Sequence, residues 1–495
     1  MKQYKKQVCN GSITIFLALS LTLIISVIFS TVESARRIAV SSYLEGVTAT
    51  CMDSVFSDYC TQLWEDYHVF AVVSDNKDFR NNLVSYIKRN LDLNDNLLEN
   101  RCSFLKSTLD TVTINDFSNF TDNYGETFIH QVLAYMQYRE ITNVADYLLS
   151  SSDVEYDPFE LADLANGDLS AEAFEALDLG PLVDMVEAAN KEMVDEDCKT
   201  DIDISETFTL DSLKNIQHIF NDMLIHYLVE SPSDISYKMI DRKGFPSTYI
   251  NISGEHQTIT YNELDRFLFC EYLVEHFSSY TTPVKDSGLD YQLEYILCGN
   301  RSDEFNLTDT AKELVILRFG FNIVHILSDQ EKMNTLASIA ETTAFIPALP
   351  IIIESLLICI WALAEAVIDV RDLLAGEEIP LLKASDDWSL SIENMLELDY
   401  ETEGAKRTSP GLSYNKYLEI LLFSKDIHTL SINTLDLIQL DFVSNINDTF
   451  SITNCIIGAS CDFKYKSKDI FSTVNFYHTT YFAPIYTFTH NYYYR

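Results

Sequence analysis

The sequence predicts an α+β protein: an N-terminal transmembrane helix that continues into a long amphipathic helix, a mostly α-helical extracytoplasmic head, and a C-terminal β-rich region. Three observations lead to this prediction. Only 14 glycines and 10 prolines occur in 495 residues, so few positions interrupt helices. A long uncharged apolar run lies near the N-terminus, and residues 451–495 are dense in Tyr, Phe, Thr, Ile and Val, which favour strands.

The chain begins with a basic cytoplasmic tip, residues 1–12, and continues with an uncharged run from Ile13 to Val32. Twenty residues that rise about 1.5 Å each span roughly 30 Å, the thickness of a bilayer's hydrocarbon core. Because positive charge stays on the cytoplasmic side, we expect a single-pass cell-membrane protein with a cytoplasmic N-terminus. The bulk of the chain is then extracytoplasmic, and the lipid bilayer is its partner through residues 13–32. A cleaved secretory signal is the alternative, but its apolar region would be about 7–15 residues long and end in a small-x-small site.

The residues that follow the apolar run predict a continuation of the helix. Residues 33–70 contain no proline and one glycine, Gly46. Apolar residues recur every four positions, at Val55, Tyr59, Leu63 and Tyr67. One continuous helix is therefore expected, and residues 33–150 are expected to form a helical stalk and the first part of the head. A membrane helix with an unbroken extension is typical of type IV pilins and their relatives.

Several segments carry a family resemblance. They are Gly11–Leu17, Glu33–Arg36 and Leu63–Tyr67, together with the segments that begin at Leu289, Leu317, Trp361 and Leu412. These segments resemble an uncharacterised family of Gram-positive bacterial membrane proteins that is described as similar to the TadE/TadG-like pseudopilins of the tight-adherence (Flp) pilus. The resemblance implies a role in pilus assembly or a related secretion system, with other pilin-like or pilus-assembly proteins as partners.

The resemblance also implies a candidate processing site between Gly11 and Ser12. Prepilin processing in the Tad system resembles cleavage after a glycine, with a glutamate at the fifth mature position. If Ser12 is the first mature residue, Phe16 is the fifth, so the acidic partner is missing. The resemblance therefore implies a minor pseudopilin or a stationary membrane protein in place of a major pilin.

The middle of the chain, residues 151–208, is an acidic segment that we interpret as a variable, solvated insertion. Between Asp153 and Glu206 there are 18 acidic residues against two lysines, so this stretch supplies a large part of the net charge of −41. Such a charge repels phosphate backbones and excludes nucleic acid as a partner. An acidic cation-binding surface protein is an alternative function, but the calcium-loop pattern around Gly167 fails, because alanines stand where Asp and Glu ligands are needed.

A helical head is predicted over residues 209–445, and it contains a second apolar stretch from Ala344 to Val370. A second membrane span is one interpretation, but two prolines and two glutamates favour a buried helix, since a carboxylate at bilayer depth costs about 2.5–3.5 kcal/mol. Trp361, Glu365 and Asp369 then share one helix face.

A buried Glu365 needs a cationic partner. Arg318, on the apolar helix from Leu314 to Leu327, is one candidate, and Arg371 or Lys383 is another. Glu365 and Asp369 are interpreted as structural acids; in a rival interpretation they serve a membrane-tethered enzyme that acts on envelope polymers.

Helix ends can also be placed. Ser328 to Glu331 has the spacing of a capping box and predicts a new helix after Leu327, while Asn306 is predicted to open the helix before it. A further helix is predicted from Tyr414 to Phe423. Residues 446–495 are predicted to be β-rich, with Pro484 at an edge or a bulge.

The sequence shows none of the common hydrolase, zinc-protease or nucleotide-binding motifs, so no enzymatic activity and no cofactor are predicted. His218, Asp222 and His226 lie four residues apart, as metal ligands on a helix would, but a polar surface stripe is the preferred interpretation. Ten cysteines do not establish disulfides, and free thiols are an equal alternative.

Overall fold

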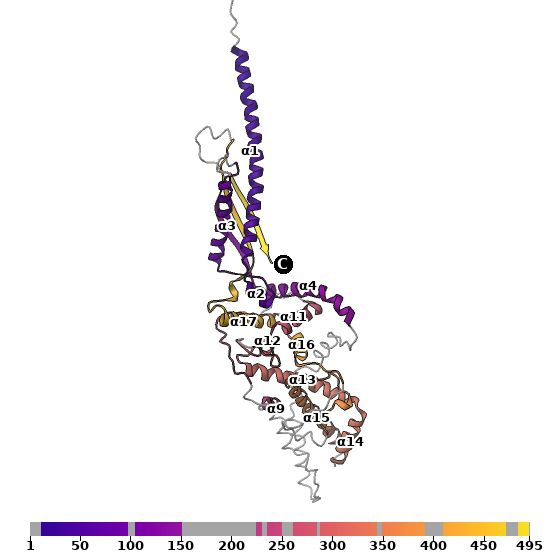
Figure 1. The fold of residues 1–495 in the computed structure, drawn as a ribbon. Coiled ribbons are helices and arrows are strands. Elements are labelled where there is room, and N and C mark those ends of the chain that lie inside the picture. The colour runs from indigo at the N-terminus through magenta and orange to yellow at the C-terminus, as the bar shows by residue number, and fades with distance from the viewer. Residues whose placement is uncertain are drawn as a thin grey trace, which may run out of the picture. The chain divides into compact units, whose positions relative to one another are not determined.

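The computed structural model describes residues 11–97, 104–150, 224–229, 235–249, 261–284, 288–343, 349–391, 409–471 and 484–494. The chain forms two compact units. Unit 1 consists of Met1–Asp122 and Thr453–Arg495, and unit 2 consists of Asn123–Ile452. In sequence, unit 2 is therefore an insertion into unit 1. The mixed α+β class is confirmed (Figure 1).

Unit 1 combines helices with one antiparallel sheet. Its elements are α1 (Gly11–Phe56), α2 (Thr61–Tyr67), β1 (Val72–Val73), α3 (Asn76–Leu97), β2 (Ser107–Asn119), β3 (Cys455–Ser467) and β4 (Ile485–Tyr493). β3 is the central strand and pairs with β1, β2 and β4. The predicted C-terminal strands thus share a sheet with β2, which lies in the range 33–150, where the sequence predicted a helical stalk and the first part of a mostly helical head. The alternating sequence of β2, STLDTVTIND, is itself a strand pattern that the helical prediction overlooked.

The core of unit 1 forms where the second half of α1 packs on this sheet. Val40, Leu44, Val47 and Cys51 follow one another at intervals of four, three and four residues, so they form one helix face, and all are buried. The opposing strand residues alternate in the same way, with Cys461, Phe463 and Tyr465 of β3 facing the core. Two matching periodicities therefore fix α1 against the sheet.

The long helix ends earlier than the sequence indicated. α1 stops at Phe56, and the predicted continuation to Phe70 is broken by a turn before α2. The backbone N–H of Cys60 donates to the carbonyl of Ala71 at 2.9 Å, so it is committed to a tertiary hydrogen bond and cannot extend α1. Tertiary pairing thus overrides a local sequence without helix breakers.

Unit 2 is helical in the part that the structure describes. Its elements are α4 (Glu126–Ser150), α9 (Leu224–Leu228), α10 (Pro246–Tyr249), α11 (Glu263–His276), α12 (Gln292–Cys298), α13 (Asp303–Ser328), α14 (Gln330–Thr343), α15 (Leu349–Leu374), α16 (Tyr414–Ser424) and α17 (Ile427–Asn445), with short 3₁₀ turns at Asp122–Gly125, Ser385–Asp387 and Ile452–Asn454.

α15 contains the second apolar stretch. It packs against α9, α13 and α14, and its side chains from Ile360 to Leu374 are buried within unit 2. Among the residues that the structure describes, α1 alone is long and apolar enough to cross a membrane. The structure is thus consistent with a core helix in this stretch.

The predicted new helix after Leu327 is present as α14, but its cap lies one residue later than predicted, and the cap of α13 lies four residues before the predicted Asn306. α13 begins at Asp303, and the Ser302 hydroxyl accepts a hydrogen bond from the N–H of Phe305, so the helix opens before the predicted Asn306. α14 is capped by Asp329, whose carboxylate accepts from the N–H groups of Glu331 and Lys332; Ser328 does not cap it. An Asp caps as well as a Ser, so spacing alone did not distinguish the two.

Candidate functional site

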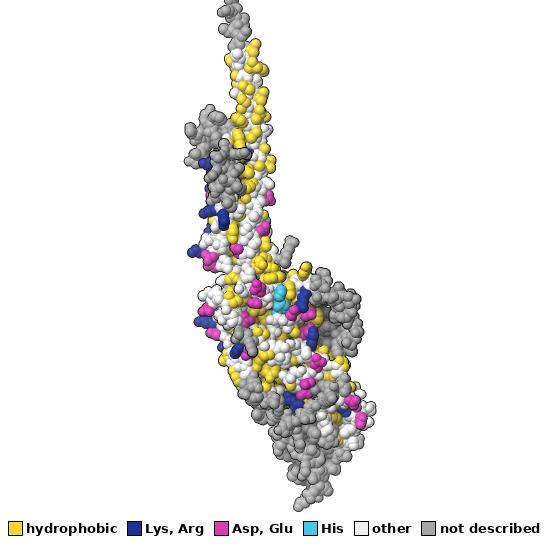
Figure 2. All heavy atoms as spheres, in the orientation of Figure 1, with side chains coloured by type: hydrophobic (Ala, Val, Ile, Leu, Met, Phe, Trp, Pro, Cys, Tyr) yellow, Lys and Arg dark blue, Asp and Glu magenta, His cyan; other side chains and the backbone are white. Residues whose placement is uncertain are grey.

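α1 carries two different surfaces along its length. From Ile13 to Val32 its large apolar side chains point outward; Phe16 is 70% exposed and Leu23 is 67% exposed (Figure 2). From Val40 onward the same helix forms the core of unit 1. An exposed apolar surface of this size is unfavourable in water and marks an interaction site.

A buried ion pair lies where the exposed surface ends. Glu33 and Arg36, one helical turn apart, are 5% and 6% exposed, and their charged groups approach to 2.7 Å. Arg36 also donates to the carbonyls of Phe104 (2.9 Å) and Lys468 (2.8 Å). Glu33 accepts from the backbone N–H groups of Ile470 (3.2 Å) and Phe471 (2.9 Å). We call Glu33 and Arg36 with these four partners the clamp, since it ties α1 to two other segments of unit 1.

The clamp perturbs the Glu33 carboxylate strongly. Burial alone would raise its pKa, but hydrogen bonds from Arg36 and from the Phe471 N–H outweigh burial and lower the pKa to about 2. Glu33 is therefore ionised over the whole physiological range. The sequence named these residues only as part of a resemblance; charges three residues apart directly after an uncharged run were the signal for the clamp.

The four structural residues singled out in the sequence meet in the interior of unit 2. The side chains of Arg318, Glu365, Asp369 and Lys383 are all 0% exposed. Asp369 contacts Arg318 at 3.0 Å through one oxygen and Lys383 at 2.6 Å through the other. Lys383 also forms an ion pair with Glu365. Two cations thus alternate with two anions, and the formal charge of this ion network is zero.

Backbone groups complete the ion network. Glu365 accepts from the N–H groups of Ser389 (2.8 Å) and Leu390 (2.9 Å). Arg318 donates to the carbonyls of Pro380 (3.0 Å) and Leu381 (2.8 Å), and to the Tyr417 hydroxyl at 3.0 Å. α13, α15, α16 and the segment after α15 are therefore joined through one guanidinium. Of the other two candidate cations for Glu365, Arg318 pairs with Asp369 and Arg371 pairs with Asp372.

Unit 2 also contains a buried carboxyl group that has no cation within hydrogen-bonding distance among the residues that the structure describes. Glu294 is 0% exposed; one of its oxygens accepts from the Tyr280 N–H and the Tyr414 hydroxyl, and the other has no hydrogen-bond partner in the structure as described. Burial is the main reason that its pKa rises to about 7.

Because the folded-state pKa of Glu294 is raised, its contribution to stability is largest below about pH 4.5 and is lost as the pH rises through about 7. Glutamine does not titrate, so we expect Glu294→Gln to remove this pH dependence. The free energy of unfolding of the variant minus that of the wild type should then change by on the order of 3 kcal/mol between pH 4.5 and pH 7. Urea unfolding of the full chain in detergent at several pH values measures it. The exposed Glu377→Gln is the control, and equal pH profiles for both variants would contradict the assignment.

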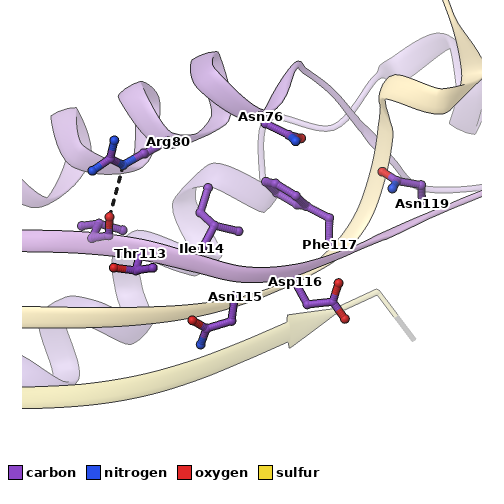
Figure 3. Close-up of a pocket in the computed structure, with 9 residues that line it drawn as sticks. Asn76, Arg80, Thr113, Ile114, Asn115, Asp116, Phe117 and Asn119 are labelled. Carbon is purple, nitrogen blue, oxygen red and sulfur yellow. Dashed lines mark hydrogen bonds between the residues drawn. The ribbon is translucent and has the colours of Figure 1, made fainter.

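A polar groove of about 720 Å³ lies in unit 1 between the start of α3 and β2 (Figure 3). Ile114 and Phe117 point toward α3, whereas Asn115 and Asp116 point to the opposite side of β2. Arg80 donates to the Val112 carbonyl at 3.1 Å. The groove is lined by three amides, the Arg80 guanidinium, the Asp116 carboxylate and the Thr113 hydroxyl. Among the described residues no base is hydrogen-bonded to this hydroxyl, so the groove shows no activated nucleophile.

Some of the other predicted sites lie partly or wholly outside the residues that the structure describes. Gly11 and Ser12 lie at the start of α1, and the surroundings of these two residues fall outside what the structure describes. The acidic segment 151–208 also lies outside the described residues, as do the side chains of His218, Asp222 and His226. Among the described residues, no cluster of three or more metal-binding side chains occurs. Seven cysteines are described, all as free thiols, and burial raises the pKa of Cys51 to about 11 and of Cys298 to about 12.

Comparison with known proteins gives one match. Residues 204–467, just over half of the chain, match a family described as "Family of unknown function (DUF5702)". The matched region includes the ion network and β3 but neither α1 nor Glu33 and Arg36. No curated protein and no solved structure matches the chain.

Proposed function

The chain belongs to this family of unknown function, and we propose that it is a membrane-anchored extracytoplasmic structural protein that assembles through α1 with other helix-anchored proteins. In its narrower form, the proposal makes it a pseudopilin-like component of a Tad/Flp-type pilus or secretion system. Its mechanism is helix packing, without catalysis.

The division of α1 into two surfaces carries the proposal. Twenty residues of the helix expose apolar side chains without a charge, and the next turns of the same helix form the core of a folded unit. A rigid connection of this kind passes the orientation of a membrane helix directly to an extracytoplasmic unit. That property suits a subunit that packs side by side with similar helices, and a flexible tether would not need it.

The narrower pilus assignment rests on the segments that resemble TadE/TadG-like pseudopilins; the matching family's description carries no link to pili. The residue at the fifth position after Gly11 is Phe16, so the acidic partner of a major pilin is missing. A minor or stationary subunit is therefore the form that we propose.

The rival enzymatic function loses its candidate residues. Catalytic carboxylates need access to substrate, whereas the side chains of Glu365 and Asp369 are 0% exposed and paired with Lys383 and Arg318. These acids support the interior of unit 2.

Anchoring is tested by alkaline carbonate extraction of membranes. The wild-type chain is expected to stay in the pellet, because an apolar helix of this length inserts stably. Leu21→Arg/Leu23→Arg is expected to release it, since each arginine at the bilayer centre costs about 2.5–3.5 kcal/mol. The control Ile38→Arg/Val73→Arg places the same charges on exposed positions outside the run and should not release the chain. Release of the wild type would overturn the proposed anchor.

Assembly needs its own experiment. A photoreactive amino acid at Leu17 or Leu21 in native membranes is expected to form adducts with a second α1 or with another membrane helix. Adducts with lipid alone would leave α1 as a simple tether and contradict assembly.

A further inference from the structure

Apolar side chains of unit 1 continue the surface of α1 beyond its own helix. The Phe471 ring lies 6.0 Å from the ring of Phe29 on α1 and 6.0 Å from the ring of Phe104 (centroid to centroid). Phe104 is 51% exposed and Ile470 is 45% exposed. Both segments are attached to the end of the apolar run through the clamp.

Basic side chains occur beside these apolar ones, in a chain with a net charge of −41. Lys106 and Lys468 are exposed, whereas Arg37, whose side chain is 49% exposed, is already paired with Asp469. Lys468 follows β3, and its carbonyl accepts the hydrogen bond from Arg36. Figure 2 shows dark-blue Lys and Arg side chains beside α1 on the face in view.

The spacing along α1 sets the height of these groups relative to a bilayer. If Ile13–Val32 fills the hydrocarbon core, Phe29 lies about 4.5 Å below its outer boundary, because the helix rises about 1.5 Å per residue. Phe471, in contact with Phe29, is then at this boundary. Arg36 lies about 6 Å above it, within the headgroup layer, which adds roughly 5–7 Å on each side of the core. Lys468, whose carbonyl binds Arg36, is at the height of the lipid phosphates.

We propose that Phe104, Ile470 and Phe471, with Lys106 and Lys468, form a collar that docks unit 1 on the outer surface of the bilayer and binds anionic phospholipids. The apolar members enter the interface, where aromatic residues are favoured, and the basic members contact the phosphates. The collar rests on the proposed anchoring by residues 13–32 and adds to it a second, lipid-specific contact. Its consequence is that unit 1 has a fixed tilt on the membrane.

The test uses the full chain in bilayers that contain lipids brominated close to the glycerol. Ile470→Trp reports on the collar, and Tyr493→Trp is the control in the same unit. Tyr493 is 49% exposed and pairs with Gly458, which lies roughly 27 Å along β3 from Lys466, at the end of the sheet away from the collar. We compare only the emission that each added tryptophan contributes beyond that of the three native tryptophans. We expect the bromolipids to quench this emission roughly twice as strongly for the collar tryptophan as for the control, since an interfacial ring contacts lipid. Phe104→Trp supplies an independent reporter if Ile470→Trp fails to fold.

The lipid specificity is tested in phosphatidylcholine bilayers with and without phosphatidylglycerol. Lys106→Glu/Lys468→Glu is expected to reduce quenching at position 470 only when phosphatidylglycerol is present. The control Lys77→Glu/Lys243→Glu makes the same charge change at two other exposed lysines and should have no effect. An equal effect of both pairs would overturn the headgroup contact.

The two proposals fail in different ways. If the chain resists carbonate extraction but neither collar tryptophan is quenched, the collar is overturned and the anchor stands. If carbonate releases the wild type, the anchor itself is wrong and the collar falls with it.

Discussion

Replacing Arg318 with methionine is expected to lower the free energy of unfolding of unit 2 by about 3–5 kcal/mol, because it leaves Asp369 buried with half of its compensating charge. The change also leaves the carbonyls of Pro380 and Leu381 without their guanidinium donor. Methionine fills much of the volume of the arginine side chain. The lost stability therefore comes mainly from the missing charge and hydrogen bonds, and less from a cavity.

Urea unfolding followed by tryptophan fluorescence measures this loss. Trp361 and Trp388 lie beside the ion network, and Lys383 Nζ is 5.4 Å from the Trp388 ring centroid. A Trp64→Phe background removes the signal of unit 1. Lys425→Met is the control, because it breaks a partly exposed ion pair. The side chains of Lys425 and Glu313 are 33% and 32% exposed, so the loss of this pair should cost at most about 1 kcal/mol.

Charge neutrality supplies a second check on the ion network. Arg318→Met/Asp369→Leu removes one cation and one anion, so it is expected to recover part of the stability lost in the single variant. Equal losses for Arg318→Met and Lys425→Met would show that the buried network has no special role.

The residues of the ion network could be predicted from the sequence. A carboxylate in an apolar helix is so costly to bury that it demands a partner, and the four-residue spacing of Trp361, Glu365 and Asp369 placed both acids on one face. The sequence left three cations open for Glu365, namely Arg318, Arg371 and Lys383, because the choice depends on how the helices pack and how the chain after α15 folds back. The structure places Lys383 there.

The topology of unit 1 was not accessible in the same way. Lys106 and Ser467 are 361 residues apart in sequence, yet the Ser467 hydroxyl donates to the Lys106 carbonyl. Local patterns predict that β3 is a strand, but they carry no information about a partner that lies beyond an inserted unit. For this reason the C-terminal strands were predicted as a separate region, whereas they complete the sheet on which α1 packs.

Arg36→Met is expected to destabilise the attachment of α1 to the segments that begin at Phe104 and follow β3, by about 3–5 kcal/mol, for the same reason as in unit 2. Glu33 would remain buried with the N–H groups of Ile470 and Phe471 and with Arg37, whose Nε is 3.9 Å away, and two carbonyls would lose their donor. Arg89→Met is the control: it removes an exposed arginine of α3 in the same unit, so its loss should cost at most about 1 kcal/mol.

Hydrogen exchange of the full chain, read on peptides from residues 104–119 and 455–471, measures this difference locally.

The pH dependence of this exchange gives a second, independent test of the Glu33–Arg36 ion pair. Since the folded-state pKa of Glu33 is lowered to about 2, its stabilisation is complete above about pH 4.5 and is lost as the pH falls toward 2. Without Arg36 the pKa of Glu33 rises, so the loss should begin at a higher pH in Arg36→Met than in Arg89→Met. Adding Glu33→Gln to Arg36→Met removes the unpaired charge and should restore part of the protection. Identical exchange in the two arginine variants would mean that burial of this ion pair does not hold α1 in place.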